Sequence, residues 1–308
     1  MLKRTMLRKF ILLSFSFALF VGLTSYVTSS SFKSVPALRK IIIDAGHGGH
    51  DGGAAGKFSR EKDVSLAVSL KLGQLISQEI PEVEVVFTRT SDIYQHPTVK
   101  ANIANQSKGD LFISIHCNSA APTRHREFTG YKTVTTGKGK KKKTKKVPQY
   151  RTWTSPSTAK GTETYIWGIN KNDFKEKVIK ENEALYLDST LAQQVSDFDP
   201  NDPEKLILYS LKTKQYFKRS ANLAMTIEDE FKKTGRISRE ARQRQVPIWV
   251  LQAVAMPSVL VELGFISNPE EEEYMNSDAG QAEMTTAIIR AIKRYKHSLE
   301  NQLIETGK

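Results

Sequence analysis

Two histidines and two glutamates of this chain have the residue types and spacing of a hydrolytic metal site. His47 lies in the stretch IIIDAGHGGHDGGAAGKFSREKD, which runs from three isoleucines through a series of glycines to Glu61 and beyond. His116 follows the apolar stretch LFISI, and Glu262 follows VLV. Two imidazoles and a carboxylate are a common ligand set for zinc, and they leave a fourth position for water. The pattern therefore indicates metal-assisted hydrolysis, with a further carboxylate available to move a proton.

Short apolar runs alternate with segments of helical periodicity, which is typical of an α/β protein. We expect strands at residues 40–46, 82–90, 110–118, 161–168, 248–254 and 258–265. We expect helices at residues 64–76, 98–106, 212–233, 269–275 and 281–297, with Thr98 as a candidate cap of the second. The chain should therefore form a single α/β domain, with a twisted, mostly parallel sheet of about six strands flanked by helices.

This fold would bring the chemistry-bearing residues to one place. Ligands of open α/β sheets bind at the carboxyl ends of the strands. His47, His116 and Glu262 all lie near such ends, and Glu61 precedes a helix that returns it to the same edge. The glycines around His47 allow sharp turns beside the metal and close approach of a bulky substrate. The stretch DAGHGG lacks the spacing of a phosphate-binding loop.

The net charge of +13 is concentrated in two segments. Residues 1–36 contribute +5 and residues 121–160 contribute +11, which leaves −3 for the rest of the chain. A nucleic-acid-binding domain carries its basic residues on a folded face together with stacking aromatics. We therefore expect no nucleic-acid partner.

Residues 1–36 have the layout of a signal peptide or signal anchor. The stretch MLKRTMLRKF is basic, ILLSFSFALFVGLTSYV is apolar, and TSSSFKS supplies small residues. The apolar part is also long enough to span a membrane without being cleaved. Both alternatives export the rest of the chain to the periplasm or cell envelope, and the second anchors it there. Cys117 is the single cysteine, so an exported domain would depend on burial and not on an intrachain disulfide.

A basic insert occupies residues 121–160. Seven lysines fall within residues 136–146, and like charges at this density repel one another. We expect a disordered loop here. One interpretation is that the loop only raises solubility. The other is that it contacts an anionic envelope surface, such as an acidic wall polymer, lipopolysaccharide or phospholipid.

Six stretches of the chain carry a family resemblance. They are, in this order, IIIDAGHGGHDGGA, REKDVSLAVSLKL, VVFTRTSD, DLFISIHCN, GTETY and MPSVLVELGFISNPEEEEYM. Together they resemble the zinc-dependent N-acetylmuramoyl-L-alanine amidases, the type 3 amidase catalytic domain. The resemblance covers residues 39–296 apart from the insertions. It implies one catalytic domain at residues 37–300, followed by a tail at residues 301–308.

The resemblance also implies roles for the four residues. The zinc ligands, for one Zn²⁺ per chain, fall on His47, Glu61 and His116, and the catalytic carboxylate falls on Glu262. The implied reaction is hydrolysis of the amide between N-acetylmuramic acid and L-alanine in peptidoglycan. Such a reaction serves cell-wall remodelling, daughter-cell separation or lysis.

Neighbouring residues are open to two interpretations each. Asn118 shares a strand face with His116 and either contacts substrate or ends the strand. Arg89 ends another strand and either faces the cleft or pairs with an acidic neighbour. We interpret His50 as a polar surface residue. Cys117 alternates away from His116 and is interpreted as a small buried residue.

Residues 171–211 form an extra segment that could be regulatory. Some cell-division amidases of the family carry a helix in this region that covers the zinc until an activator protein removes it. Here Glu181 or Glu183 could supply a blocking carboxylate, or both could lie on a solvated helix face. Two other functional classes stay open: a zinc exopeptidase acting on free peptides, and a non-catalytic wall-binding module.

Overall fold

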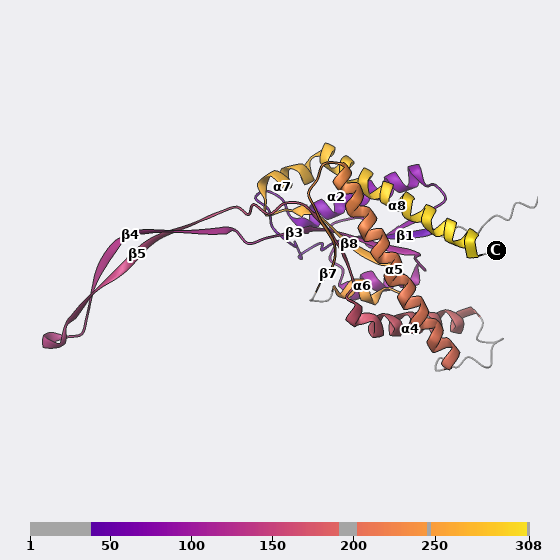
Figure 1. Cartoon of the computed structure of the whole chain (residues 1–308), viewed down its shortest axis with the longest axis horizontal. Helices are drawn as coiled ribbons and strands as arrows, with labels where there is room; N and C mark the ends of the chain where they lie inside the picture. The colour runs from indigo at the N-terminus through magenta and orange to yellow at the C-terminus, as the bar shows by residue number, and fades with distance from the viewer. Residues whose placement is uncertain (1–37, 191–201, 245–247, 307–308) are drawn as a thin grey trace, which may run out of the picture. The chain divides into compact units, whose positions relative to one another are not determined.

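A six-stranded sheet forms the centre of the computed structural model, which describes residues 38–190, 202–244 and 248–306 (Figure 1). The strand order is β2-β1-β3-β8-β6-β7. In chain order these strands are β1 Lys40–Ala45, β2 Glu84–Phe87, β3 Leu111–Asn118, β6 Thr162–Ile166, β7 Ser238–Gln243 and β8 Ser258–Phe265. All neighbours pair in parallel except β6 and β8, which are antiparallel. The predicted mostly parallel α/β sheet is therefore confirmed.

Helices cover both faces of this sheet (Figure 1). One face packs against α2 Glu61–Glu79, α5 Pro203–Lys233 and α8 Asp278–Thr306. The other packs against α3 Pro97–Gln106 and α6 Trp249–Ala253, and α4 Asn172–Thr190 packs on α6. The other helical elements are α7 Pro269–Asn276, which packs on α8, and the short 3₁₀ turns η1 Gly139–Lys141 and η2 Ile169–Lys171.

The three isoleucines of β1 explain why this strand is apolar throughout. Ile41 and Ile43 enter the core on the α2, α5 and α8 face, whereas Ile42 enters the core on the α3 and α6 face. All three side chains are fully buried. Full burial of an isoleucine stabilises the fold by about 1.5–3 kcal/mol, so this strand fixes the centre of the sheet on both sides.

Two segments differ from the sequence-based prediction. The predicted strand at residues 248–254 is instead helix α6, at Trp249–Ala253, because periodicity cannot distinguish a short buried apolar run in a strand from one in a helix. Strand β7 was not predicted, because its sequence SREARQ is polar. It lies at the edge of the sheet, where one side has no strand partner and charged side chains are favoured.

Two helix starts also differ from the prediction. Helix α5 begins at Pro203 and not near residue 212, because Asp202 caps it by accepting a hydrogen bond from the backbone N–H of Glu204. Helix α3 is capped by the side chain of His96, which accepts from the backbone N–H of Thr98. Thr98 is therefore inside the first turn, and its predicted role as the cap is wrong.

The lysine-rich segment forms a hairpin, so the predicted disordered loop is wrong. Strands β4 Thr123–Thr136 and β5 Lys143–Ser155 pair antiparallel with each other only. Threonine, valine and aromatic residues, which favour strands, alternate here with the cations. Cross-strand ring pairs such as Phe128–Tyr150 and His125–Trp153 add stabilisation that a count of lysines does not reveal.

One compact unit spans Ala37–Lys308. The predicted signal peptide or anchor concerns residues 1–36, which lie outside the described residues. Across the described ranges, the helices are either too short or too polar to span a membrane.

A buried ion pair holds the carboxyl end of β1. The ammonium of Lys100, on α3, lies 2.9 Å from a carboxylate oxygen of Asp44 and donates to the carbonyl of Ala45. Asp44 also accepts from the hydroxyls of Ser114 and Thr88. Burial alone would raise the pKa of Asp44, but the charge of Lys100 and the hydrogen bonds from Ser114 and Lys100 hold it below its usual range. Helix α3 is thus tied to the strand that leads to His47.

We expect Lys100→Met to destabilise the protein by about 3–5 kcal/mol, because it leaves the Asp44 carboxylate buried without its cation. Urea unfolding measures this. The double variant Asp44→Asn/Lys100→Met removes both charges and should recover part of the loss. The control Lys71→Met breaks an exposed pair with Asp278 and should cost about 1 kcal/mol or less. A double variant no more stable than Lys100→Met would contradict the charge argument.

Candidate metal centre

The loop after β1 presents His47 in an unusual backbone conformation. The φ angle of His47 is 56°, in the left-handed region that costs a non-glycine residue about 1 kcal/mol or more. The loop before and after it is tightly packed. A Cβ atom on Gly46 would lie 2.5 Å from Cε1 of His116, and one on Gly53 would lie 2.5 Å from Oε2 of Glu61. The glycines therefore let the loop backbone lie directly against the two other site residues.

Glu61 is the first residue of α2 and connects the parts of the site. The residue is 4% exposed. Oε2 accepts from the backbone N–H of Ala54, and Oε1 accepts from the backbone N–H of Cys117. The same two oxygens lie 3.1 Å from Nε2 of His47 and 2.7 Å from Nδ1 of His116. One carboxylate thus links the loop after β1, the start of α2 and the end of β3.

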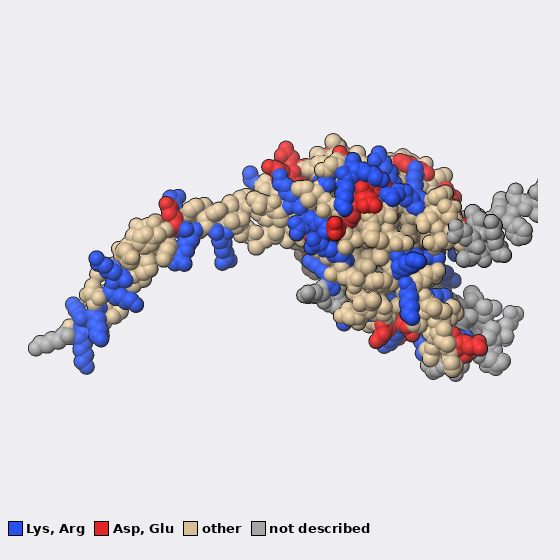
Figure 2. Space-filling view, viewed as in Figure 1, with Lys and Arg blue, Asp and Glu red and all other residues tan. Residues whose placement is uncertain are grey.

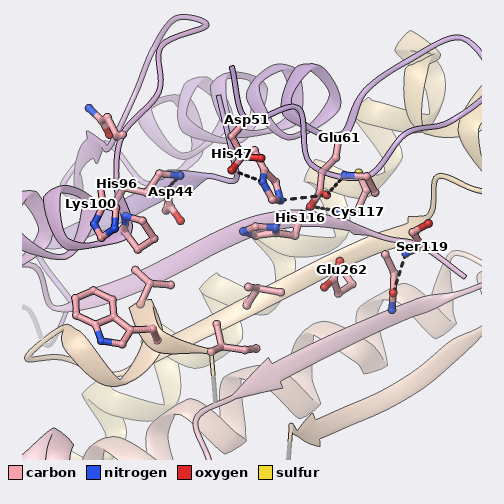
Figure 3. A pocket seen from close by; sticks show the side chains of 18 of the residues that line it. Asp44, His47, Asp51, Glu61, His96, Lys100, His116, Cys117, Ser119 and Glu262 are labelled. Carbon is pink, nitrogen blue, oxygen red and sulfur yellow. Dashed lines mark hydrogen bonds and ion pairs between the residues drawn. The ribbon is translucent and has the colours of Figure 1, made fainter. Parts of the chain in front are cut away.

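His47, Glu61 and His116 meet in a geometry that suits a metal ion (Figure 3). One ligand atom from each residue can be chosen so that all three lie within 4.8 Å of one another. Nδ1 of His47 hydrogen-bonds to Asp51, at 2.8 Å, which leaves Nε2 directed toward Glu61. A carboxylate behind a ligating histidine is the usual support of a metal-bound imidazole. The structure thus brings together the three residues that we expect as ligands. Their donor atoms and their mutual distances suit a bound metal ion.

The electrostatics of the three side chains favour an added positive charge. Burial alone would lower the pKa of His47, but hydrogen bonds and charge from Glu61 and Asp51 outweigh burial and raise the pKa to about 9. Burial alone would raise the pKa of Glu61, but both histidines outweigh it and hold that pKa well below its usual range. A metal cation bound between these groups would replace the proton on His47 and would pair with the Glu61 carboxylate in its place.

Glu262 lies on β8 directly opposite His116 in the parallel ladder. The residue is 6% exposed, and its Oε2 has no hydrogen-bond partner among the described residues. Burial raises the pKa of Glu262 to about 7, although the nearby His116 acts in the opposite direction. Figure 3 shows Glu262 beside the three candidate ligands, without a hydrogen bond to them. A carboxyl group in this state can both accept and donate a proton near neutral pH.

A cavity of about 620 Å³ contains all four residues. The cavity is also lined by Asp44, Lys100 and Tyr94, and by Trp249 of α6. Sequence reasoning missed Asp51, Asp44 and Lys100. The signal for Asp51 was an acid four residues after His47, and the signal for Asp44 was an acid that ends a run of isoleucines. Nothing in the sequence around Lys100 pointed to a buried lysine.

Asn118 and Arg89 have different environments. Asn118 lines the cavity, and its amide donates to Glu163 on β6. Its contact with substrate stays a prediction. Arg89 is 2% exposed and donates to the backbone carbonyls of Ala45 and Gly46. The guanidinium therefore supports the loop from behind and is not among the residues that line the cavity, and its contact with substrate, one of the two alternatives, stays a prediction.

His50 and Cys117 lie where the sequence placed them. His50 is exposed, and its ring packs on Tyr94 with centroids 4.1 Å apart. The Cys117 side chain is buried in the core on the α2 face of the sheet, and burial raises the pKa of its thiol. Neither belongs to the candidate ligand group found among the described residues.

Glu181 and Glu183 lie on α4, away from the candidate ligands. Glu181 pairs with Lys177 one turn earlier, and Glu183 pairs with Lys212 on α5. Neither is among the described residues that line the cavity, so these carboxylates do not block the site in this structure. Their autoinhibitory role, and the activator that would relieve it, stay predictions.

Comparisons with known proteins agree with this geometry. Residues 41–294 match the family model described as N-acetylmuramoyl-L-alanine amidase. N-acetylmuramoyl-L-alanine amidase AmiC of Escherichia coli O6:H1 is 30% identical over 258 residues, which are 83% of this chain and 52% of that protein. N-acetylmuramoyl-L-alanine amidase AmiA of Salmonella typhimurium LT2 is 26% identical over 280 residues, which are 90% of this chain and 82% of that protein. The chain thus spans about half the length of the first relative and most of the second.

A solved structure supports the fold. The crystal structure of N-acetylmuramoyl-L-alanine amidase from Clostridium difficile 630 aligns with a TM-score of 0.54 at 22% identity. The alignment covers 85% of this chain and 98% of that one. At this identity the likeness establishes the shared architecture alone.

We expect Asp51→Ala to weaken binding of a divalent metal ion by about 10- to 100-fold, because His47 loses the partner that orients its ring. Competition against a chromogenic chelator measures the affinity. Asp63→Ala removes an exposed carboxylate in the first turn of α2 and serves as the matched control, with unchanged affinity. Equal affinities of the two variants would show that Asp51 does not support the ligand.

Proposed function

The chain belongs to the N-acetylmuramoyl-L-alanine amidase family, and we propose from this membership that it hydrolyses the amide between N-acetylmuramic acid and L-alanine in peptidoglycan, with zinc as cofactor. The observation that carries the proposal is the convergence of His47, Glu61 and His116 beside the buried Glu262. Family membership supports the bond that is cleaved, and the arrangement of side chains supports the mechanism.

Zinc is the metal that this donor set suits best. Two imidazole nitrogens and one carboxylate oxygen form the protein ligands of many hydrolytic zinc sites. His47, Glu61 and His116 would hold one ion. When bound, zinc polarises a carbonyl group and lowers the pKa of its bound water to about 7. The exposed side of the three residues opens into the cavity, which leaves room for water and substrate.

Glu262 supplies the proton transfers in the proposed mechanism. Its carboxylate accepts the proton of the attacking water and then donates that proton to the alanine nitrogen as the C–N bond breaks. A pKa near 7 suits both steps, because the group must gain and lose the same proton in one turnover. Burial of Glu262 keeps bulk water away from this proton.

The wall of the cavity restrains the parts of the substrate that do not react. Asn118 is held by Glu163, which is itself paired with Arg239 and hydrogen-bonded by Tyr165. A restrained amide at this position can bind a peptide or N-acetyl group without losing much conformational freedom. Wall remodelling, daughter-cell separation and lysis are the roles that this reaction would serve.

The proposed substrate lies outside the cytoplasm. We therefore propose that the basic and apolar stretches of residues 1–36 direct export to the periplasm or cell envelope, by a cleaved signal or as an anchor. The acidic balance of the chain outside its two basic segments gives no reason to invoke a nucleic acid.

Digestion of purified peptidoglycan by the chain without residues 1–36 tests the reaction. We expect stem peptides with a free L-alanine amine, identified by mass analysis, and loss of this release when a zinc chelator is added. Re-addition of zinc should restore it. Cleavage between amino acids of the stem peptide, without release from the glycan, would favour a zinc exopeptidase. Binding to the wall with no product would favour a non-catalytic module.

We expect Glu262→Gln to lower the rate of stem-peptide release by about 10²- to 10⁴-fold, because glutamine has a similar shape but cannot accept the proton. Glu262→Ala should behave similarly. Both variants should bind one zinc ion per chain, as measured by metal analysis of the purified protein, because Glu262 is not among the three ligands. A Glu262→Gln enzyme with near wild-type turnover, or one that loses its zinc, would refute this role.

A further inference from the structure

The hairpin of β4 and β5 contributes little to the core of the domain. Its two strands pair with each other and with no strand of the central sheet. Nearly every described side chain from residue 123 to residue 155 is exposed or half-buried. An isolated two-stranded hairpin is marginally stable at best. Because this hairpin adds little to the stability of the domain, we looked for a binding role of its surface.

The hairpin concentrates positive charge. It carries a single anion, Glu127, and eleven cations: Arg124, Arg126, Lys132, Lys138, Lys140, Lys141, Lys142, Lys143, Lys145, Lys146 and Arg151. Figure 2 shows Lys and Arg side chains at several places along the hairpin, with a group of them toward the end that lies away from the domain. The self-repulsion of these charges weakens the hairpin by itself, and an anionic partner would relieve it.

Aromatic side chains lie exposed between these cations. Phe128 is 51% exposed, Tyr131 66%, Tyr150 41% and Trp153 46%. The ring of Phe128 contacts both Tyr131 and Tyr150, and the guanidinium of Arg126 lies 3.3 Å from the centre of the Tyr150 ring. Exposed rings that cluster on a surface mark an interaction site.

The register of the strands places rings and cations together on both faces. Directly paired residues share a face. Phe128 and Tyr150 therefore share one face with Arg126, and Trp153 shares the opposite face with Arg151. Neither face is continuously apolar, as an element that inserts into a lipid bilayer requires. Alternation of rings and cations suits a polymer that carries both carboxylates, which pair with the cations, and apolar C–H faces, which pack on the rings.

The hairpin also begins next to the candidate site. Strand β3 ends at Asn118, in the cavity wall, and β4 begins at Thr123. Strand β5 ends at Ser155, and β6 follows with Glu163, the hydrogen-bond partner of Asn118. A polymer that occupies the cavity with one unit therefore lies close to the base of the hairpin with its adjacent units.

We propose that the β4–β5 hairpin is a binding arm for peptidoglycan, the substrate of the proposed function, on which this inference rests. The Lys and Arg side chains pair with the carboxylates of the stem peptides. The exposed rings pack against the C–H faces of the sugars. The arm holds the polymer while the site acts on one of its amides, so it contributes affinity for the wall and not chemistry.

Binding of the full chain to purified sacculi, measured by sedimentation, tests the proposal. Lys143→Gln/Lys145→Gln/Lys146→Gln should weaken binding by about 5- to 50-fold, since each lost pair has the strength of an exposed ion pair. The matched control Lys214→Gln/Lys218→Gln/Lys232→Gln removes the same charge from exposed lysines of α5 and should bind within about 2-fold of wild type. The difference should shrink at high salt. Equal binding by the two variants would overturn the proposal.

A second variant tests the rings. Tyr150→Ala/Trp153→Ala keeps every hairpin cation and should weaken sacculus binding by about 5-fold or more, because both rings lose the apolar contact that they make with the sugars. Replacing residues 123–155 by a short Gly/Ser linker should abolish the contribution of both groups at once. Unchanged sacculus binding by the linker variant would overturn the proposal even if a point variant misfolds. Preferential binding to phosphatidylglycerol vesicles over sacculi would also overturn it, in favour of a membrane contact.

A soluble muramyl-peptide fragment separates this inference from the proposed function. The fragment is too short to reach the arm, so the linker variant should cleave it at the wild-type rate while losing activity on sacculi. If wild type leaves the fragment uncleaved, the proposed function fails, whereas sacculus binding still reports on the arm. If the linker variant cleaves sacculi as fast as wild type, the arm is not used.

Discussion

The buried carboxylate of Glu61 is the interaction around which the rest of the site is organised. It accepts backbone hydrogen bonds from Ala54 and Cys117 and lies against His47 and His116. These groups come from two separate parts of the chain, the loop after β1 and the end of β3, and Glu61 itself begins α2. A charged carboxylate in so little water is costly unless it is paired on every side. In this fold two of the groups that pair with the carboxylate are the imidazoles of His47 and His116, which could bind the same metal ion as Glu61.

Buried cationic side chains hold the backbone at the end of β1, directly before His47. Arg89 and Lys100 converge on the carbonyl of Ala45, where β1 gives way to the loop. Their side chains therefore determine the direction in which the chain leaves the sheet. The strained φ of His47 persists because the surrounding contacts over-determine it. Such a site loses little freedom when it takes up a metal, which is what a hydrolytic centre requires.

Charge is divided sharply between the parts of the chain. Apart from its two basic segments the chain has a net charge of −3, whereas the β4–β5 hairpin has eleven cations and one anion. A strongly basic chain would ordinarily suggest a nucleic-acid partner. Here the cations lie on a hairpin that begins beside the cavity wall, which is the basis for the proposal that they hold the peptidoglycan substrate near the candidate metal site.

The amino-acid sequence was enough to predict the α/β class, five of the six strands of the sheet and the residues that converge on its edge, His47, Glu61, His116 and Glu262. It could do so because an apolar run that ends in glycine and histidine is a local pattern, and strand ends in parallel sheets meet at one edge. Only the tertiary structure decided the role of Arg89, the pairing of Lys100 and the hairpin. The roles of Arg89 and Lys100 depend on contacts between residues that lie far apart in the chain. The hairpin depends on cross-strand pairs within a segment whose charge suggested disorder. Local sequence patterns do not reveal either kind of contact.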